Sequence, residues 1–253
     1  MCFKCTDSVS KSGVSANHKP ASPMRRRLLS LLPAAAAGSI FAGTASAQPQ
    51  PPKPANQLTP DQALERLMQG NERYVSGKTS AKDFASTRAA LSAGQNPYAC
   101  LLSCADSRVG PEFCFDESRG DLFVTRVAGN YVTTDILGSL EYAVAVLGAP
   151  LIMVLGHSSC GAVSAAISAQ KDNAAFPGHI QVLASAIAPA VRAAQAQSGE
   201  GSMLERATRE NVRLNAELLA GSSPVLRKQV EAGKLKVVGG IYHLDTGRVE
   251  VLA

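Results

Sequence analysis

The sequence lacks any excess of positive charge beyond its first 47 residues. The 253-residue chain has 25 Lys and Arg against 20 Asp and Glu, which gives a formal net charge of +5. That excess falls entirely within residues 1–47, and the remainder is neutral and has no basic run. An electrostatic surface for the phosphates of a nucleic acid is therefore not expected.

No apolar run predicts a lasting membrane anchor. Residues 28–41 are apolar, but Pro33 interrupts them and they fall short of the roughly 20 residues that a spanning helix needs. Arg25-Arg26-Arg27 precede this run and Ala45-Ser46-Ala47 follow it, a pattern typical of an export signal cleaved after Ala47. We expect an exported, periplasmic protein without a membrane anchor once the leader, residues 1–47, is removed.

The arginines of the leader also bear on the export route. Arg25-Arg26, followed by Leu28 and Leu29, resembles the twin-arginine pattern that directs proteins to export, although Met24 stands where Ser or Thr is usual. Residues 1–23 are either a long polar start of the signal or lie upstream of a translation start at Met24. The sequence leaves both questions open.

The six cysteines do not form a disulfide framework. Two of them precede the cleavage site as a CxxC pair with no second pair, and Cys104 and Cys160 lie in the motifs described below. Cys100 lies in an apolar run and is expected to be a small buried side chain. Cys114 is expected in a loop, either as a free thiol or bridged to Cys100.

The folded part of the chain is expected to begin after a linker rich in Pro and Gln, residues 48–57. Residues 58–253 are long enough for one α/β domain. Thr59, Pro60 and Gln62 are typical of a helix start, with an N-cap, a proline at the first position and a capping box. Gly70 is expected to end that helix.

Apolar runs of strand length alternate with helical periodicity in the rest of the domain. This alternation predicts a mostly parallel sheet covered by helices on both faces. The expected strands cover residues 98–104, 122–124, 151–155 and 235–238. The expected helices cover residues 136–147, 162–170 and 203–220. A hairpin around Asp245-Thr246-Gly247 would add an antiparallel edge strand.

Two short motifs follow two of the expected strands and contain metal-binding side chains. They are Cys104-Ala105-Asp106-Ser107-Arg108 and His157-Ser158-Ser159-Cys160-Gly161. Ligands of open α/β sheets gather beyond the carboxyl ends of the strands, so both motifs are expected at one site. Two thiolates and one imidazole suit zinc, and three protein ligands leave a fourth position open, as in catalytic sites. The candidate zinc ligands are Cys104, His157 and Cys160.

Each motif has an ordinary alternative interpretation when it is taken alone. A cysteine near an aspartate is common by chance, and a His-x-x-Cys pair is as often part of a core. Asp106 and Arg108 could form a surface ion pair. His179 and His243 have no nearby cysteine and are expected to be surface or loop residues.

In combination and in this order, the motifs resemble the signature of the β-class carbonic anhydrases, C-x-D-S-R followed by H-x-x-C-G. The similarity extends from about Thr59 to Leu252. Further segments that match the family are Gly70-Asn71-x-Arg73-Tyr74, Phe123-Val124-x-Arg126, Ala128-Gly129-Asn130, Glu141-Tyr142-Ala143-Val144, Asn211-Val212, Tyr242 and Thr246-Gly247.

This resemblance implies a fold, a reaction and a partner. The fold is a sheet of four parallel strands with a fifth antiparallel strand, flanked by helices, and an N-terminal helical arm that embraces a second subunit. The reaction is the reversible hydration of CO2 to bicarbonate and a proton, by attack of a hydroxide on one Zn2+ per chain. A homodimer is implied as the smallest active unit, because the family's pocket takes side chains from both subunits.

The resemblance also implies roles for the site residues. Asp106 would accept a hydrogen bond from the zinc-bound nucleophile, and Arg108 would hold its carboxylate. Gln95 would donate a hydrogen bond to a substrate oxygen. The apolar wall would come from Phe123 and Tyr142, and the backbone of Gly161 would face the substrate. Taken without the family, Gln95 is a loop residue and the two aromatic residues belong to the core.

A regulatory feature of some family members is missing from this sequence. Those members carry a second, non-catalytic bicarbonate pocket, marked by a tryptophan three residues before the first zinc cysteine and a glycine one residue before it. Here these positions hold Leu101 and Ser103, and the chain contains no tryptophan. We therefore expect an open site, in which Asp106 is paired with Arg108 and does not bind the zinc.

Two other functions remain possible for the same residues. One is the hydrolysis of carbonyl sulfide or carbon disulfide, which uses the same zinc chemistry on the same fold. The other is a non-catalytic zinc-binding module, although a structural site would not need Asp106, Arg108 or Gln95.

Overall fold

A computed structural model describes residues 57–197 and 199–252 of the chain. The predicted leader, residues 1–47, and all but the last residue of the predicted linker lie outside this described part. Both therefore stay predictions. Within the described part, none of the helices has the length and apolar character required to cross a bilayer.

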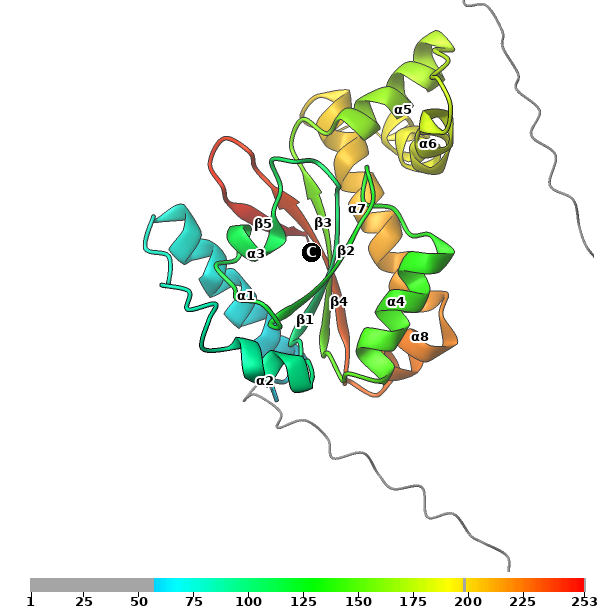
Figure 1. The fold of residues 1–253 in the computed structure, drawn as a ribbon. Helices are drawn as coiled ribbons and strands as arrows, with labels where there is room; N and C mark the ends of the chain where they lie inside the picture. The colour runs from blue at the N-terminus through cyan, green and yellow to red at the C-terminus, as the bar shows by residue number, and fades with distance from the viewer. Residues whose placement is uncertain (1–56, 198, 253) are drawn as a thin grey trace, which may run out of the picture. The chain divides into compact units, whose positions relative to one another are not determined.

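The centre of the described domain is one five-stranded sheet in the order β2-β1-β3-β4-β5 (Figure 1). The first four strands in this order run parallel, and β5 runs antiparallel to β4. The strands are β1 (Ala99–Ser103), β2 (Leu122–Arg126), β3 (Leu151–His157), β4 (Lys236–Tyr242) and β5 (Val249–Leu252). The predicted α/β sheet with an antiparallel edge strand is confirmed, and β2, β3 and β4 extend further toward their carboxyl ends than predicted.

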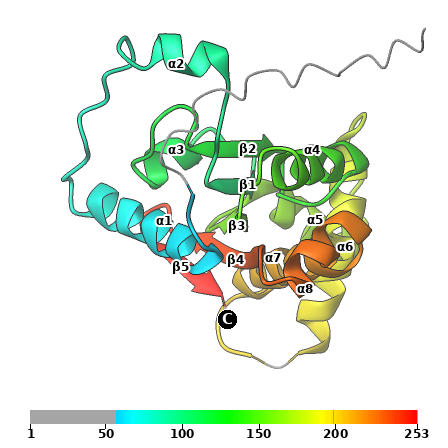
Figure 2. The ribbon, with the colours of Figure 1, turned by 90° about the horizontal axis from the view of Figure 1, so that it is seen from below.

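Helices cover both faces of the sheet. Successive side chains of a strand point to opposite faces, and the buried strands present apolar side chains on both. Leu101 and Met153 pack toward one face, with α1 (Pro60–Val75) and α3 (Pro111–Cys114). Leu102 and Val154 pack toward the other face. That second layer consists of α4 (Thr134–Ala145), α7 (Met203–Gly221) and α8 (Pro224–Glu231). Figures 1 and 2 show the two layers on opposite sides of the sheet.

A third apolar cluster lies beyond the carboxyl ends of the strands. It joins α5 (Gly161–Asp172), α6 (Ile180–Ala196) and the first turns of α7, and it includes Cys104 and Cys160. Figure 1 shows α5 and α6 beyond the end of the sheet. Helix α6 has no counterpart among the predicted helices. Pro189 lies inside it, and proline normally interrupts the hydrogen bonds of a helix.

The prediction that Gly70 ends the first helix is wrong. Helix α1 begins as predicted, with the Thr59 capping box and Pro60 at its first position, but it continues to Val75. Gly70 is buried inside the helix, where a Cβ atom would lie only 1.9 Å from the carbonyl oxygen of Phe115. Glycine is therefore needed here for the close approach of two backbone segments.

Among the described residues, the two cysteines outside the motifs are free and buried. Cys100 lies in β1, as expected of a small core side chain. Cys114 is the last residue of α3, so its predicted place in a loop is wrong. The structure has no bridge between these two cysteines.

Candidate metal centre

The three candidate ligands meet at the carboxyl ends of β1 and β3. Cys104 directly follows β1, His157 is the last residue of β3, and Cys160 is the N-cap of α5. Because β1 and β3 are neighbours in register, their ends bring the first two side chains together. The sulfur and nitrogen atoms of the three residues lie within 4.8 Å of one another, and all three side chains are buried. The two Sγ atoms are 4.0 Å apart.

The ring of His157 is oriented with one nitrogen toward the two sulfurs. Its Nδ1 lies 2.9 Å from the carbonyl oxygen of Ser158, to which it donates in the tautomer that carries the proton on Nδ1. Its Nε2 is buried and has no hydrogen-bond partner among the described residues. A buried nitrogen with a free lone pair is costly unless it binds something, and a metal-ligating histidine usually donates its other N–H in this way.

The sulfur pair also fits a cation. The hydrogen bond with Cys160 is the main cause that lowers the pKa of Cys104 far below the usual value of a thiol. The same hydrogen bond raises the pKa of Cys160. Two thiolates at this distance repel each other in a buried site, whereas a divalent cation between them would stabilise both. Cys160 also lies at the N-terminus of α5, where the helix dipole favours a negative charge.

Asp106 and Arg108 form a two-pronged ion pair beside the ligands. Arg108 donates from Nε to Oδ1 at 2.9 Å and from Nη2 to Oδ2 at 2.8 Å. The backbone N–H of Arg108 also donates to Oδ1 at 2.9 Å. The side-chain hydrogen bonds from Arg108 are the largest cause that holds the pKa of Asp106 below its usual range. Oδ2 of Asp106 lies 3.8 Å from Nε2 of His157, which places the carboxylate next to the metal-binding atoms.

Arg126 fixes the backbone of the first motif. Its Nε donates to the carbonyl oxygen of Cys104 at 2.9 Å, and its Nη2 donates to the carbonyl oxygens of Asp106 and Val109, both at 2.8 Å. Arginine suits this task because its planar group presents several donors in fixed directions. The sequence predicted no role for Arg126 beyond a match to the family. The acceptors are backbone atoms, which leave no trace in the sequence.

A second unpredicted set of contacts reaches the sulfur of Cys104 from α7. The N–H of Gly129 donates to this Sγ at 3.2 Å, and the carbonyl oxygen of Gly129 accepts from Nδ2 of Asn211 at 2.8 Å. Gly129 and Asn211 had appeared only as family matches. The sequence offered one signal, an asparagine at position 211 inside the predicted helix 203–220, because Asn is a poor helix former. The structure shows that Gly129 and Asn211 are both buried.

The predicted substrate-binding residues divide into two groups within the chain. Gly161 opens α5 next to Cys160, and its surroundings would leave a Cβ atom without neighbours within 4 Å. Gln95, in contrast, is an exposed residue that precedes β1, whereas Cys104 follows that strand. One chain therefore does not bring Gln95 to its own ligands.

Phe123 and Tyr142 also lie toward the amino end of the sheet. Phe123 is paired in register with Cys100, four residues before Cys104, which corresponds to about 13 Å along a strand at the usual rise of about 3.3 Å per residue. The ring of Tyr142 lies 6.5 Å from that of Phe123, and its side chain is 46% exposed. The two aromatic residues form one apolar surface, separate from the ligands of their own chain.

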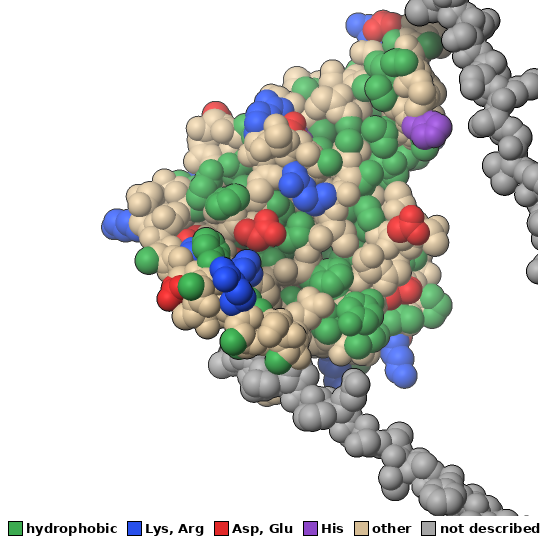
Figure 3. Space-filling model, in the orientation of Figure 1, with side chains coloured by type: hydrophobic (Ala, Val, Ile, Leu, Met, Phe, Trp, Pro, Cys, Tyr) green, Lys and Arg blue, Asp and Glu red, His purple; other side chains and the backbone are tan. Residues whose placement is uncertain are grey.

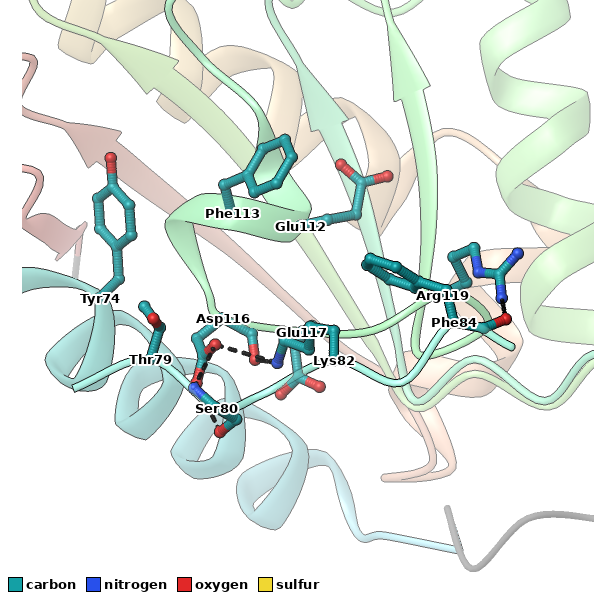
Figure 4. Close-up of a pocket in the computed structure, with 10 residues that line it drawn as sticks. All are labelled: Tyr74, Thr79, Ser80, Lys82, Phe84, Glu112, Phe113, Asp116, Glu117 and Arg119. Carbon is teal, nitrogen blue, oxygen red and sulfur yellow. Dashed lines mark hydrogen bonds and ion pairs between the residues drawn. The ribbon is translucent and has the colours of Figure 1, made fainter. Parts of the chain in front are cut away.

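An apolar hollow of about 710 Å3 lies between α1, α3 and the segment that follows α1. None of the three candidate ligands lines it. Figure 4 shows Phe84 and Phe113 at its rim, and these side chains are 49% and 75% exposed. On the face drawn in Figure 3, apolar side chains also reach the surface in several places, and basic and acidic side chains are interspersed. Exposed aromatic side chains around a hollow are typical of a surface that binds another protein.

Comparisons with known proteins agree on one family. A family model described as carbonic anhydrase matches residues 99–249, which contain all three candidate ligands. Carbonic anhydrase 2 of Mycobacterium tuberculosis is 40% identical over 190 residues, which cover 75% of this chain and 91% of the relative. The carbonic anhydrase of Mycolicibacterium smegmatis is 37% identical over 193 residues, with coverages of 76% and 93%.

Solved structures with a similar fold belong to the β class. One of two tetrameric β-carbonic anhydrases from Sordaria macrospora matches with a TM-score of 0.60 at 25% identity, covering 75% of this chain and 96% of that protein. The Coccomyxa β-carbonic anhydrase in complex with acetazolamide matches with a TM-score of 0.54 at 30% identity, with coverages of 75% and 86%.

Proposed function

The chain belongs to the β-class carbonic anhydrase family, and from this membership we propose that it catalyses the reversible hydration of CO2 to bicarbonate and a proton at one Zn2+ per chain. The observation that carries the proposal is the cluster of three buried donor atoms within 4.8 Å, with the Asp106 carboxylate beside it. A structural zinc site normally uses four protein ligands. Within the described residues this cluster has three.

Zinc would be held by Cys104, His157 and Cys160. Bound there, it would lower the pKa of a water molecule from 15.7 to about 7, as in the unrelated carbonic anhydrases, and so supply a nucleophile at neutral pH. The unpartnered Nε2 of His157 and the close sulfur pair support this assignment. Thiolates and imidazole are the ligand types that zinc prefers.

The protein's own part in the reaction is to orient the nucleophile. Arg108 occupies both oxygens of the Asp106 carboxylate, so the carboxylate stays ionised and fixed in place. Oδ1 accepts two hydrogen bonds from Arg108, whereas Oδ2 accepts one and keeps a further lone pair. We assign to Oδ2 of Asp106 the acceptance of a hydrogen bond from the nucleophile. Arg108 acts through Asp106, and its Nη2 also reaches the carbonyl oxygen of Ser159 at 3.3 Å, which ties the two motifs together.

The substrate pocket requires a second subunit in this proposal. Gln95, Phe123 and Tyr142 lie toward the opposite end of the sheet from the ligands of their own chain, so they would contribute to the site of a partner. The exposed apolar side chains Phe84 and Phe113 support a homo-oligomer with at least two subunits. CO2 has little polarity, and an apolar wall with a single amide donor suits it.

Stopped-flow CO2 hydration, measured on purified protein with its zinc content determined, tests the proposal. We expect about one zinc per chain and hydration that a chelator abolishes. Bound zinc without hydration would contradict the proposal and favour a non-catalytic module. Faster turnover of carbonyl sulfide or carbon disulfide than of CO2 would also contradict it and assign the site to those substrates.

Export is a separate part of the proposal and rests on the leader sequence. We propose that the mature protein begins near Gln48 in the periplasm. N-terminal sequencing of protein from a cell-envelope fraction would then return Gln48 or a neighbouring residue. A start at Met1 or Met24 would contradict export with cleavage. The twin-arginine route predicts that replacing Arg25 and Arg26 with lysine blocks export.

A further inference from the structure

Gly129 connects the sulfur of Cys104 with helix α7. Its backbone N–H donates to Sγ of Cys104 at 3.2 Å, and its carbonyl oxygen accepts from Nδ2 of Asn211 at 2.8 Å. Gly129 and Asn211 are both buried, so water cannot replace either partner. The two contacts form a chain of hydrogen bonds from the amide of Asn211 to a proposed metal ligand.

Gly129 needs an external anchor in order to point its N–H at the sulfur. Its φ of +86° lies in the left-handed region, which glycine adopts without strain. A side chain would be strained at this φ and would force its neighbours to shift, because a Cβ atom would lie 2.4 Å from Cδ1 of Ile187 and 3.1 Å from Cβ of Ala162. The residue is therefore both crowded and intrinsically flexible. The hydrogen bond from Asn211 fixes the carbonyl group of Gly129, which points away from the sulfur of Cys104.

The amide of Asn211 is itself oriented by the next turn of α7. Nδ2 of Asn215 donates to Oδ1 of Asn211 at 3.2 Å, which leaves Nδ2 of Asn211 directed at Gly129. Oδ1 of Asn215 accepts from the backbone N–H of Val132 at 2.7 Å. The two asparagines thus bind the same loop from the same helix, but only Asn211 binds the residue that touches Cys104.

We propose that Asn211 is a positioning residue for the Cys104 thiolate, acting through the backbone of Gly129; the inference rests on the proposed zinc site. It holds the Gly129 N–H against the sulfur before the metal arrives, so that the ligand is already in place. The N–H also withdraws electron density from the thiolate and limits the charge that the sulfur donates to the metal. Asn211 touches neither metal nor substrate and is not a catalytic residue.

The test compares Asn211→Leu with Asn71→Leu in the full protein. Asn71 is the matched control, because it is a buried asparagine of α1 whose Nδ2 donates to the carbonyl oxygens of Cys114 and Gly247, away from the candidate ligands. A purely structural role of Asn211 predicts that the two substitutions have similar effects on metal binding. The zinc dissociation constant is measured by competition with a chelator. Cobalt(II) is then used as a spectroscopic probe, because the energy of its sulfur-to-metal charge-transfer band reports how strongly the thiolates donate. Thermal unfolding of each variant without metal measures the loss of stability.

We expect Asn211→Leu to weaken zinc binding about 10- to 100-fold, the usual cost of losing a group that orients a metal ligand. Its cobalt charge-transfer band should move to longer wavelength, because a thiolate without its N–H donor gives up charge more easily. Asn71→Leu should lower the unfolding temperature at least as much, yet leave the band in place and change zinc affinity less than about threefold.

Equal zinc affinities and equal cobalt spectra for the two variants would overturn the proposal. Should Asn211→Leu not fold, the comparison is made with Asn211→Asp and Asn71→Asp. These changes keep the shapes of the side chains. Asn211→Asp sets a carboxylate oxygen against the Gly129 carbonyl, whereas Asn71→Asp sets one against the carbonyls of Cys114 and Gly247 and leaves Gly129 unchanged. Failure of the proposed function has a different signature, since the parent protein itself would then bind no zinc.

Discussion

Arg108 holds the carboxylate of Asp106 with two parallel hydrogen bonds, and Oδ2 of that carboxylate lies 3.8 Å from Nε2 of His157. The ion pair is thus built into the wall of the candidate metal centre and is not a surface pair that faces only solvent. Asp106 is less exposed than Arg108, with side-chain exposures of 17% and 54%. The arginine therefore lies on the outside and fixes the acid on the inside.

Asp106→Asn should keep the zinc and lose hydration activity. The amide fills the same space but accepts less strongly than a carboxylate and cannot pair with Arg108, so the nucleophile is less well oriented. We expect kcat to fall about 10- to 100-fold, the range typical of partners that orient a metal site. Stopped-flow hydration and zinc analysis of the same sample check this. Asp135→Asn, which changes an aspartate in the first turn of α4, is the control. A parental rate for Asp106→Asn would remove the orienting role.

Cys160→Ser should lose most of the zinc. A hydroxyl is a far poorer ligand than a thiolate at neutral pH, and the substitution leaves only Cys104 and His157 in the cluster. Zinc per chain is measured after dialysis. Cys114→Ser is the matched control, because it changes another buried thiol that lies outside the cluster. A Cys160→Ser protein that keeps one zinc per chain would show that the ligands are wrongly assigned.

Arg126→Lys should reduce activity with the zinc retained. Arg126 donates to the carbonyl oxygens of Cys104, Asp106 and Val109, and lysine cannot reproduce this fixed fork of donors. The Asp106 loop should become less well fixed, with a loss of about tenfold in kcat and little change in zinc content. Arg119→Lys is the control, since the contacts of that arginine are with residues 84–87. Equal activities for the two variants would assign Arg126 a structural role only.

The sequence predicted the sheet and the ligand cluster because both depend on short local patterns. Buried runs define the strands, and the two motifs follow strands that are neighbours in a parallel sheet. Contacts between distant backbone segments could not be predicted in this way. Gly70 looked like a helix end, whereas it permits the approach of the Phe115 carbonyl. The hydrogen bonds of Arg126 likewise end on carbonyl oxygens, which every residue has.

The sequence predicted which residues would form the proposed substrate pocket, but not how they are arranged in space. Gln95 is nine residues before Cys104 in the sequence, but β1 lies between them and carries the two residues to opposite ends of the sheet. Nearness in sequence therefore says little about nearness in space once a strand intervenes. The same reason separates Phe123 from the ligands. The proposed arrangement, in which a second copy of the chain completes the site, is not encoded in the local pattern of either segment.

Asp116 should make the protein sensitive to acid. Its buried carboxylate accepts from Nε of Arg73 at 2.6 Å. It also accepts from the backbone N–H of Ser80 at 3.0 Å and lies 3.0 Å from Nζ of Lys82, and Figure 4 shows these two residues beside it. Burial opposes ionisation, but these partners outweigh it and hold the pKa of Asp116 below its usual range. A lowered pKa adds stability above the unfolded value of about 3.9, and this stability is lost as the pH falls further.

Asp116→Asn measures that contribution. The φ of Asp116 is +48°, a conformation that asparagine also tolerates, so the substitution adds little strain. We expect the free energy of unfolding at pH 7 to fall by about 1 to 3 kcal/mol. The difference from the parent should stay constant down to about pH 5 and shrink below about pH 4. Denaturant unfolding at several pH values checks this, and a difference that does not depend on pH would contradict it.

Bicarbonate should not switch this enzyme off. Leu101 and Ser103 stand where regulated family members have tryptophan and glycine, so the indole N–H on which a second bicarbonate pocket depends is missing here. Both residues are completely buried in β1. Without that pocket, bicarbonate has no greater affinity for a closed state and cannot shift its population. The Asp106 carboxylate, paired with Arg108, corresponds to the open arrangement.

Activity should then fall gradually below neutral pH, over about two pH units, as expected for one titrating group. Hydration rates measured across this range, with added bicarbonate and with chloride at equal ionic strength, test the prediction. A steep, cooperative loss between roughly pH 8 and 7 that bicarbonate deepens and chloride does not would refute it, because a single group cannot titrate so sharply.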